Sequence, residues 1–255
     1  MVQRPRPPHR PRHDDTETTQ GLRAGLALVA ARPDDVLRIA FARELRHELV
    51  PLLRTAAAHS LDCRETTGAE LDRIAGSGHH EGLLVEARPR RWLSSGELAE
   101  LLVRVRGTAL ALDRVRNPYN VGAALRGAAF FGVDAALLGA PAPHPGLPPT
   151  AVRVAEGGVE RVALARTTDL ADTLGRLRSR GVKVVGTDGE APEDALAFAF
   201  ARPTVLVMGN EREGLGDRVR AQCDAVVAIR GSGAVESLNV AVAAGVLAAA
   251  MTRRR

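Results

Sequence analysis

Apolar residues recur at different spacings in two parts of the chain. In the first part, Leu22, Leu26 and Val29 fall on one helical face, and the apolar run at 36–40 predicts a strand. The pattern goes on to predict a helix over 44–58, a short helix over 67–74 and a strand over 83–87. We expect these elements to form a small α/β unit over residues 21–88.

Beyond residue 108, apolar strands alternate with longer helical stretches. The predicted strands cover 108–113, 134–138, 182–186, 203–208 and 225–229, and the predicted helices cover 121–131, 168–180 and 239–252. Strands joined in this way by helices form parallel sheets that are covered on both faces. The pattern therefore predicts an α/β fold with a parallel sheet over residues 108–255.

The remaining segments lack a hydrophobic period. Residues 1–20 begin with Arg, Pro and His and continue with polar residues, which predicts a disordered tail. Residues 89–107 join the two units. We expect a linker there that contains a short helix beginning near Ser94.

Positive charge is concentrated near the two ends of the chain. The 255 residues carry a net charge of +5, which is typical of a protein with a polyanionic partner. Four arginines lie within residues 1–13 and three at 253–255. Their combined positive charge is larger than the net charge of the chain, so the body between them is slightly acidic. A nucleic-acid surface on the folded body is therefore expected to be a local patch, and the tails can equally serve only solubility.

The residue content disfavours several classes of protein. Cys63 and Cys223 lack the spacing of metal ligands, and no cysteine lies near His79 and His80, so no metal is expected. The apolar stretch 238–251 is too short to cross a bilayer, and the N-terminal region has no apolar signal core. We therefore expect a reduced, cytoplasmic protein without a membrane segment.

Three blocks with polar side chains follow predicted strands. They read Asn-Pro-Tyr-Asn-Val-Gly-Ala-Ala-Leu-Arg at 117–126, Gly-Asn-Glu-Arg-Glu-Gly-Leu at 209–215 and Ser-Leu-Asn-Val at 237–240. In open α/β sheets, ligands bind beyond the carboxyl ends of the strands, where these blocks should lie. Arg126 stands among small apolar residues, which favours a functional target for its side chain. Ser237 and Asn239 are both candidate N-caps of the last helix.

In this order the three blocks resemble the motifs of the SpoU/TrmH family, the RNA ribose 2′-O-methyltransferases of the SPOUT superfamily. The resemblance implies a C-terminal parallel-sheet domain with a deep trefoil knot, which forms a homodimer. It also implies that residues 21–88, with His-His-Glu-Gly where the family often has His-Gln-Gly, form a ribosomal-protein L30e-like domain that binds the RNA substrate. Residues 108–255 would then be the methyltransferase domain, acting on rRNA or tRNA.

The resemblance also implies roles for individual residues. Arg126 would be the catalytic arginine, assisted by Asn120, Glu211 and Asn239, with Glu211 orienting Arg126 through a bidentate pair. The cofactor would be S-adenosyl-L-methionine, held by Thr187, Met208, Gly209, Asn210, Ile229, Ser237, Leu238 and Asn239. A guanidinium is a weak base, so Arg126 can act either as the base or as a stabiliser of the developing alkoxide.

The sequence departs from the family pattern at two positions. Arg230 stands where a proline is usual, and Ala241 stands where a serine is frequent. One alternative is an RNA-binding protein of the same fold without turnover, which would not bind S-adenosylmethionine. Another is a nucleotide-binding oxidoreductase, for which Gly231-Ser232-Gly233 is an incomplete motif at the wrong end of the sheet.

Overall fold

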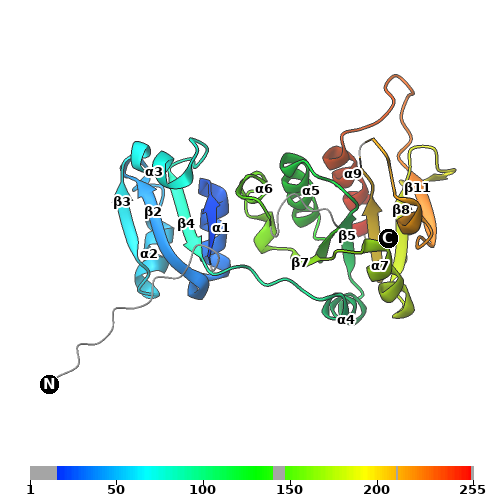
Figure 1. The fold of residues 1–255 in the computed structure, drawn as a ribbon, viewed down its shortest axis with the longest axis horizontal. Helices are drawn as coiled ribbons and strands as arrows, with labels where there is room; N and C mark the ends of the chain where they lie inside the picture. The colour runs from blue at the N-terminus through cyan, green and yellow to red at the C-terminus, as the bar shows by residue number, and fades with distance from the viewer. Residues whose placement is uncertain (1–15, 140–146, 211, 254–255) are drawn as a thin grey trace. The chain divides into compact units, whose positions relative to one another are not determined.

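A computed structural model describes residues 16–139, 147–210 and 212–253, and the chain divides after Arg90 into two compact units (Figure 1). Each unit has its own sheet and its own hydrophobic core. Within the described ranges, no helix is both long and apolar enough to cross a membrane.

The first unit is a four-stranded sheet with helices packed against it. Its strands are β1 (Glu17–Gln20), β2 (Val36–Ala42), β3 (Cys63–Thr66) and β4 (Leu83–Ala87), in the spatial order β1-β4-β2-β3. Strand β4 is antiparallel to both β1 and β2, whereas β3 is parallel to β2. The helices are α1 (Leu22–Ala31), α2 (Val50–Ala58) and α3 (Gly68–Ala75), with short 3-10 turns η2 (Pro33–Asp35) and η3 (Arg43–Leu45).

Three details of the first unit differ from the sequence prediction. Residues 17–20 form strand β1, so the prediction of disorder is wrong for them, and strand β3 was not predicted at all. The helix predicted over 44–58 begins only at Val50. Pro51 explains this late start, because proline lacks an N–H donor and is accommodated in the first turn of a helix.

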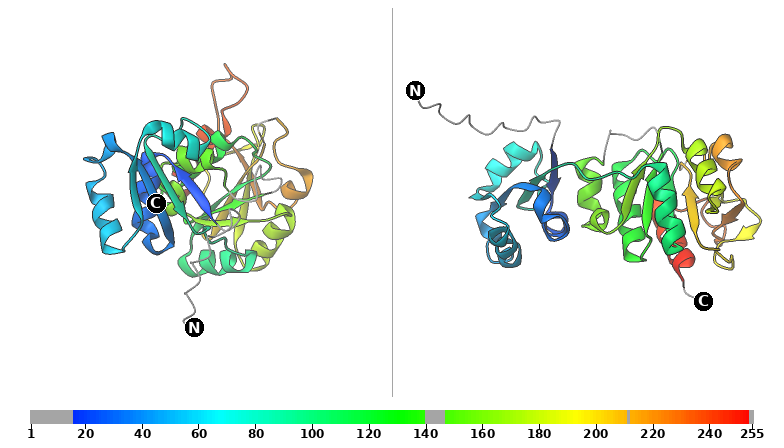
Figure 2. Two further views of the ribbon diagram at one scale, coloured as in Figure 1. Left: turned by 60° about the vertical axis from the view of Figure 1, so that its left-hand side comes forward. Right: turned by 90° about the horizontal axis from the view of Figure 1, so that it is seen from below.

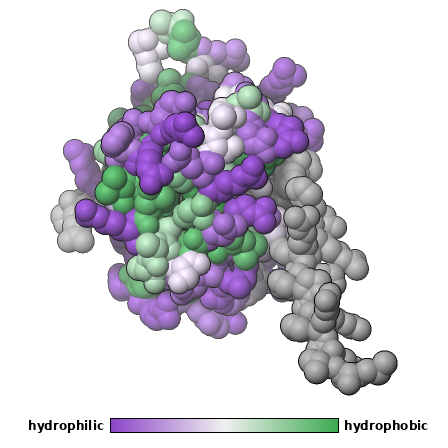
Figure 3. All heavy atoms as spheres, turned by 90° about the vertical axis from the view of Figure 1, so that its left-hand side faces the viewer, coloured by the Kyte–Doolittle hydropathy of each residue, from purple (hydrophilic) through white to green (hydrophobic). Residues whose placement is uncertain are grey.

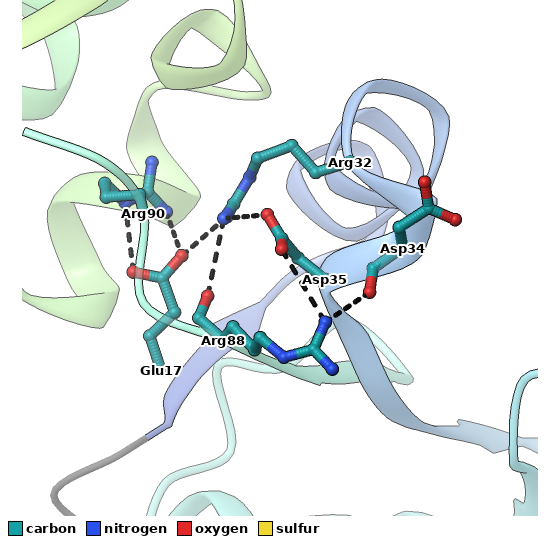
Figure 4. Close-up of polar contacts among 6 residues, drawn as sticks. All are labelled: Glu17, Arg32, Asp34, Asp35, Arg88 and Arg90. Atoms are coloured by element: carbon teal, nitrogen blue, oxygen red, sulfur yellow. Dashed lines mark hydrogen bonds and ion pairs between the residues drawn. The ribbon is translucent and has the colours of Figure 1, made fainter.

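Strand β1 is held in place by a cluster of charged side chains (Figure 4). The Glu17 carboxylate accepts hydrogen bonds from Arg32 Nη2 at 2.6 Å and from Arg90 Nη2 at 3.0 Å and Nε at 3.1 Å. Arg32 also donates to the Asp35 carboxylate and to the Arg88 carbonyl. The Arg90 side chain is only 5% exposed, so the cluster fixes both β1 and the chain segment that leaves β4.

The second unit is built on a seven-stranded sheet in which every pair is parallel. Its strands are β5 (Thr108–Leu112), β6 (Ala135–Leu138), β7 (Ala163–Arg166), β8 (Lys183–Thr187), β9 (Glu193–Asp194), β10 (Thr204–Met208) and β11 (Ala225–Ala228). The spatial order is β7-β6-β5-β10-β8-β11-β9, so β10 lies between two strands that precede it in the chain. The predicted α/β fold with a parallel sheet is confirmed, although β7 and β9 were not predicted.

Helices cover both faces of this sheet (Figure 2). They are α4 (Ser95–Val105), α5 (Pro118–Phe130), α6 (Pro149–Val154), α7 (Leu170–Ser179), α8 (Asp217–Arg220) and α9 (Val240–Thr252), with the 3-10 turn η4 (Gly158–Glu160). On one face, α4, α7 and α8 share a core with the strands. Helix α9 packs against α5 and against β5, and α5 packs against α6.

Helix α4 belongs to the second unit, although the sequence placed it in a linker over 89–107. It begins with a complete capping box formed by Ser94 and Glu97. Its apolar side chains Leu98 and Leu102 are fully buried in the core that α4 shares with α7. The linker prediction is therefore too long, because a helix that buries leucines contributes to a domain.

The charged cluster around Glu17 makes a prediction about stability. We expect Glu17→Ala to lower the unfolding free energy of the first unit by about 2 kcal/mol, because a buried guanidinium loses charge-assisted hydrogen bonds. Denaturant unfolding followed by circular dichroism measures this loss. In the control Asp34→Ala, the side chain removed is 92% exposed, and the change should stay within about 0.5 kcal/mol. Equal losses in both variants would contradict the role of Glu17.

Candidate active site

The loops that leave β5 and β10 are joined at the carboxyl edge of the sheet. Asn210 Nδ2 donates to the Arg114 carbonyl at 3.0 Å, and Asn210 Oδ1 accepts from the Arg212 amide at 2.9 Å. The backbone of Asn210 also exchanges two hydrogen bonds with Gly214. Asn210 is therefore paired with Gly214 within its own block and anchored to the loop of the neighbouring strand.

Gly209 is required by the close return of this loop. A methyl group at Gly209 would lie 2.3 Å from the backbone carbon of Gly214 and 2.6 Å from the amide nitrogen of Leu215. Gly214 itself has φ +63°, the left-handed region that favours glycine. The two glycines let the backbone fold back onto itself directly above β10.

Asp113 and Arg114 also organise this edge, and the sequence analysis assigned neither a role. The buried Asp113 carboxylate accepts from the Gly216 amide at 3.0 Å. Arg114 pairs with the Glu213 carboxylate and donates to the Gly214 carbonyl at 3.1 Å. The signal that was available is the position of Asp113, a charged residue directly after a fully buried apolar strand.

The first and third blocks meet through two asparagines. Asn239 Nδ2 donates to Asn120 Oδ1 at 3.0 Å, which connects the start of α9 to the first turn of α5. Asn239 Oδ1 accepts from the Ala241 amide at 2.9 Å and thereby caps α9. Asn239, rather than Ser237, is thus the N-cap, and its side chain both begins the helix and ties the helix to α5.

Arg126 lies on α5 and contacts a residue that the sequence analysis did not select. Its Nη1 atom is 2.9 Å from Oε1 of Glu156, and its side chain is 56% exposed. Glu156 follows α6 and has φ +46°. Glu211, the expected partner of Arg126, lies outside the described residues, so the predicted bidentate pair stays a prediction. A glutamate before two glycines at a helix end was the available signal.

The remaining predicted cofactor residues lie at the ends of β8, β10 and β11 and in the loop just before α9. The Thr187 hydroxyl donates to the Val207 carbonyl at 3.0 Å, and Met208 is buried. Ile229 is half-buried, whereas Ser237 and Leu238 are exposed. Arg230 donates to the carbonyls of the loop before β9, at Ala191 and Pro192. The loop from β11 to α9 therefore presents its side chains outward.

Side chains that could bind a metal or act as a nucleophile are the remaining candidates for chemistry. Among the residues that the structure describes, no three His, Cys, Asp or Glu side chains gather as metal ligands. His80 accepts from the Gly82 amide and contacts Asp72, as a loop histidine does. Burial raises the pKa of the Cys223 thiol to about 11, so this thiol is protonated at neutral pH and is a poor nucleophile.

A parallel sheet with polar loops beyond β5, β8, β10 and β11 defines an α/β protein, and in open sheets of this class ligands bind beyond the carboxyl ends of the strands. A family model, the SpoU rRNA methylase family, matches residues 107–249. The chain belongs to this family of RNA methyltransferases.

Curated relatives agree with the family. The chain is 37% identical over 243 residues to the 23S rRNA (guanosine-2′-O-)-methyltransferase RlmB of Pseudomonas aeruginosa, covering 94% of this chain and 97% of that protein. It is 34% identical over 253 residues to a tRNA/rRNA methyltransferase of Mycobacterium avium described as uncharacterized, covering 98% and 82%.

Solved structures share the fold. An AdoMet-bound rRNA methyltransferase from Sinorhizobium meliloti aligns with TM-score 0.76 and 22% identity, over 93% of this chain and 87% of that one. The SpoU methyltransferase AviRb from Streptomyces viridochromogenes, in complex with AdoMet, aligns with TM-score 0.76 and 24% identity, over 94% and 90%.

The turn at Gly209 makes a prediction about cofactor affinity. We expect Gly209→Ala to weaken S-adenosylmethionine binding by about tenfold or more, because the added methyl group forces the 210–214 turn away from β10. Isothermal titration calorimetry measures this affinity, and circular dichroism checks that the fold is kept. The control Gly189→Ala places its methyl group in open space. Unchanged affinity in a folded Gly209→Ala protein would show that the turn does not shape the cofactor site.

Proposed function

We propose that this protein transfers a methyl group from S-adenosylmethionine to a ribose 2′-hydroxyl of ribosomal or transfer RNA. The observation that carries the proposal is the joining of the three polar blocks at one edge of the sheet. Asn210 reaches the loop after β5, and Asn239 reaches α5, the helix that carries Arg126. Residues far apart in sequence are thus brought together at one edge of the sheet, which supports a two-substrate transfer there.

The RNA substrate is proposed from the relatives. RlmB proteins, including one from Vibrio cholerae at 36% identity, are named for 2′-O-methylation of guanosine in 23S rRNA. A guanosine of 23S rRNA is therefore the first substrate to test, with tRNA as the second because of the Mycobacterium avium relative's name. These relatives are bacterial, which favours the predicted cytoplasmic location.

The loops at the carboxyl edge fit the proposed cofactor. Gly209 leaves no room for a side chain, so main-chain atoms of the 209–214 turn would face a ligand there. Ile229, Ser237 and Leu238 would hold it from the other side, with Thr187 and Met208 at the strand ends. When bound, S-adenosylmethionine supplies an electrophilic methyl group that a ribose 2′-oxygen can attack once its proton leaves. The chain's own task is then to place the hydroxyl.

Arg126 is the proposed catalytic residue. Its half-exposed guanidinium can reach an incoming polyanion, and a guanidinium binds phosphate oxygens with good geometry. It would hold the RNA and stabilise negative charge as it develops on the 2′-oxygen. Asn120, in the first turn of the same helix, and Asn239, which is hydrogen-bonded to it, would orient the ribose or the cofactor.

We also propose the trefoil knot of the SPOUT superfamily for residues 108–255. Two features support it. Strand β10 is inserted between β5 and β8, which both precede it, and its turn is fastened to the loop after β5. After the 229–239 loop, helix α9 returns to pack against α5. Knots are rare exceptions among protein folds, so the family membership weighs in this proposal.

The first unit is the proposed L30e-like RNA-binding domain. Figure 3 shows one face of the molecule, over the first unit, where hydrophilic side chains surround smaller hydrophobic areas. Exposed arginines of this unit include Arg43, Arg46, Arg64 and Arg73. Because the body of the chain is slightly acidic, RNA contact would rely on such local groups.

The proposed activity is tested by tritiated methyl transfer to unmodified RNA. We expect wild-type protein to label one RNA species, and Arg126→Ala to lose about a hundredfold or more of this rate while still binding S-adenosylmethionine. The control Arg176→Ala removes an exposed guanidinium from α7, where it pairs with Asp172, and should keep full activity.

Two outcomes contradict the proposal. A full rate in Arg126→Ala would remove Arg126 from the mechanism. Absence of both labelling and cofactor binding in the wild-type protein would favour an RNA-binding protein of this fold without turnover.

We further propose a homodimer through the second unit. Large apolar side chains are exposed on the packed helices α5 and α9, among them Tyr119 and Phe130 on α5 and Val242 on α9. Surfaces of this kind are usually covered by a partner.

Val242→Glu should shift the protein from dimer to monomer in analytical ultracentrifugation, and a glutamate is tolerated in the first turn of a helix. The control Val103→Glu alters a valine on α4 that is 44% exposed, against 53% for Val242, and should stay dimeric.

A further inference from the structure

The contact between Arg126 and Glu156 joins two segments that are packed backbone against backbone. A methyl group at Gly122 would lie 2.5 Å from the Ala151 carbonyl oxygen, and one at Gly158 would lie 3.1 Å from Cα of Arg126. Glycines on both segments therefore allow α5 and the α6–η4 segment to pack closely, and one of these contacts is at Arg126 itself. The position of Glu156 beside Arg126 is consequently fixed by the fold and not only by its flexible side chain.

The backbone at Glu156 adopts a conformation that is unfavourable for a residue with a side chain. Glu156 has φ +46° and the next residue, Gly157, has φ +87°, so two successive residues are left-handed. Glycine or asparagine adopts this conformation more easily than glutamate does. A glutamate in this position indicates that its carboxylate has a use, because strained residues gather at functional sites.

The ion pair itself is too exposed to serve stability. The Arg126 side chain is 56% exposed and that of Glu156 is 34% exposed, so solvent screens their attraction. The pair can nevertheless hold the Arg126 guanidinium in one orientation, because an arginine side chain without such a contact samples many rotamers. A guanidinium also carries more N–H donors than one carboxylate can accept, so the paired Arg126 still has donors for RNA.

We infer that Glu156 is a positioning residue, which holds the Arg126 guanidinium in the orientation needed for methyl transfer. This inference rests on the proposed function and assigns the positioning to Glu156 in addition to the predicted Glu211. Glu156 touches Arg126 and acts through it. Because the charge of Glu156 is negative, this residue does not attract a polyanionic substrate. Its contribution is to the orientation of Arg126.

Two substitutions separate positioning from a structural role. Glu156→Gln keeps the size of the side chain and removes the charge. Glu156→Gly removes the side chain and relieves the left-handed backbone, so its melting temperature should be equal to or higher than that of the wild type. The control Glu100→Gln removes the charge from an exposed glutamate on α4 that pairs with Arg180.

Steady-state methyl transfer gives the first readout. We expect kcat to fall about tenfold in both Glu156 variants, with KM for RNA unchanged or lower, because orientation is lost while local negative charge is removed. If Glu156 served only folding, both substitutions would instead lower the melting temperature and leave kcat unchanged. Glu100→Gln should match the wild type in both constants.

Arginine-selective ¹⁵N NMR of the free protein gives a readout that does not require turnover. The Arg126 side-chain signal, assigned by its absence in Arg126→Ala, should report a restrained guanidinium in the wild type and a freely rotating one in Glu156→Gly. An unchanged Arg126 signal, or full kcat in both Glu156 variants, overturns the inference about Glu156. If Arg126→Ala is inactive in the same experiments, the proposed function still stands. A wild-type protein that transfers no methyl group overturns both.

Discussion

The insertion of β10 between β5 and β8 is the constraint on which the site depends. The chain that leaves this strand turns back within a few residues, since the backbone of Asn210 pairs with that of Gly214. Gly209 and Gly214 permit this turn, and Asn210 fastens it to the loop after β5. Asp113 and Arg114 hold the far side of the same turn. A ligand at this edge therefore meets backbone that is already in place, and preorganisation of this kind reduces the entropic loss on binding.

Two neutral amide side chains, those of Asn210 and Asn239, join segments that are far apart in the sequence. The hydrogen bond from Asn239 to Asn120 fixes α9 on α5 while the same asparagine caps α9. Amide pairs add no net charge, which suits the proposed site for a cationic sulfonium and a polyanion. The charge that acts on the substrate can then come from one residue, Arg126, at a half-exposed position on a rigid helix.

The sequence predicted the parts of the structure that depend on local pattern. Strands β5, β10 and β11 are continuous apolar runs, and their polar ends marked the edge where the three blocks meet. Strand β1 is polar and was read as disordered, because its pairing with β4 and the contacts of Glu17 come from distant residues. Glu156 was missed for the same reason: its contact with Arg126 exists only because glycines bring two segments together. Tertiary packing, unlike periodicity, leaves little trace in one sequence.

The exposure of Arg126 and Glu156 argues for a role in orientation. A pair this exposed contributes at most about 1 kcal/mol to stability, and a left-handed glutamate loses a comparable amount in its backbone. The two effects roughly cancel, so folding alone gives no reason for a glutamate where glycine would be easier. Transfer to a ribose oxygen, in contrast, is sensitive to small errors in alignment, and a misplacement of about 1 Å can slow a reaction about a hundredfold. An interaction with almost no net effect on stability can therefore have a large effect on rate.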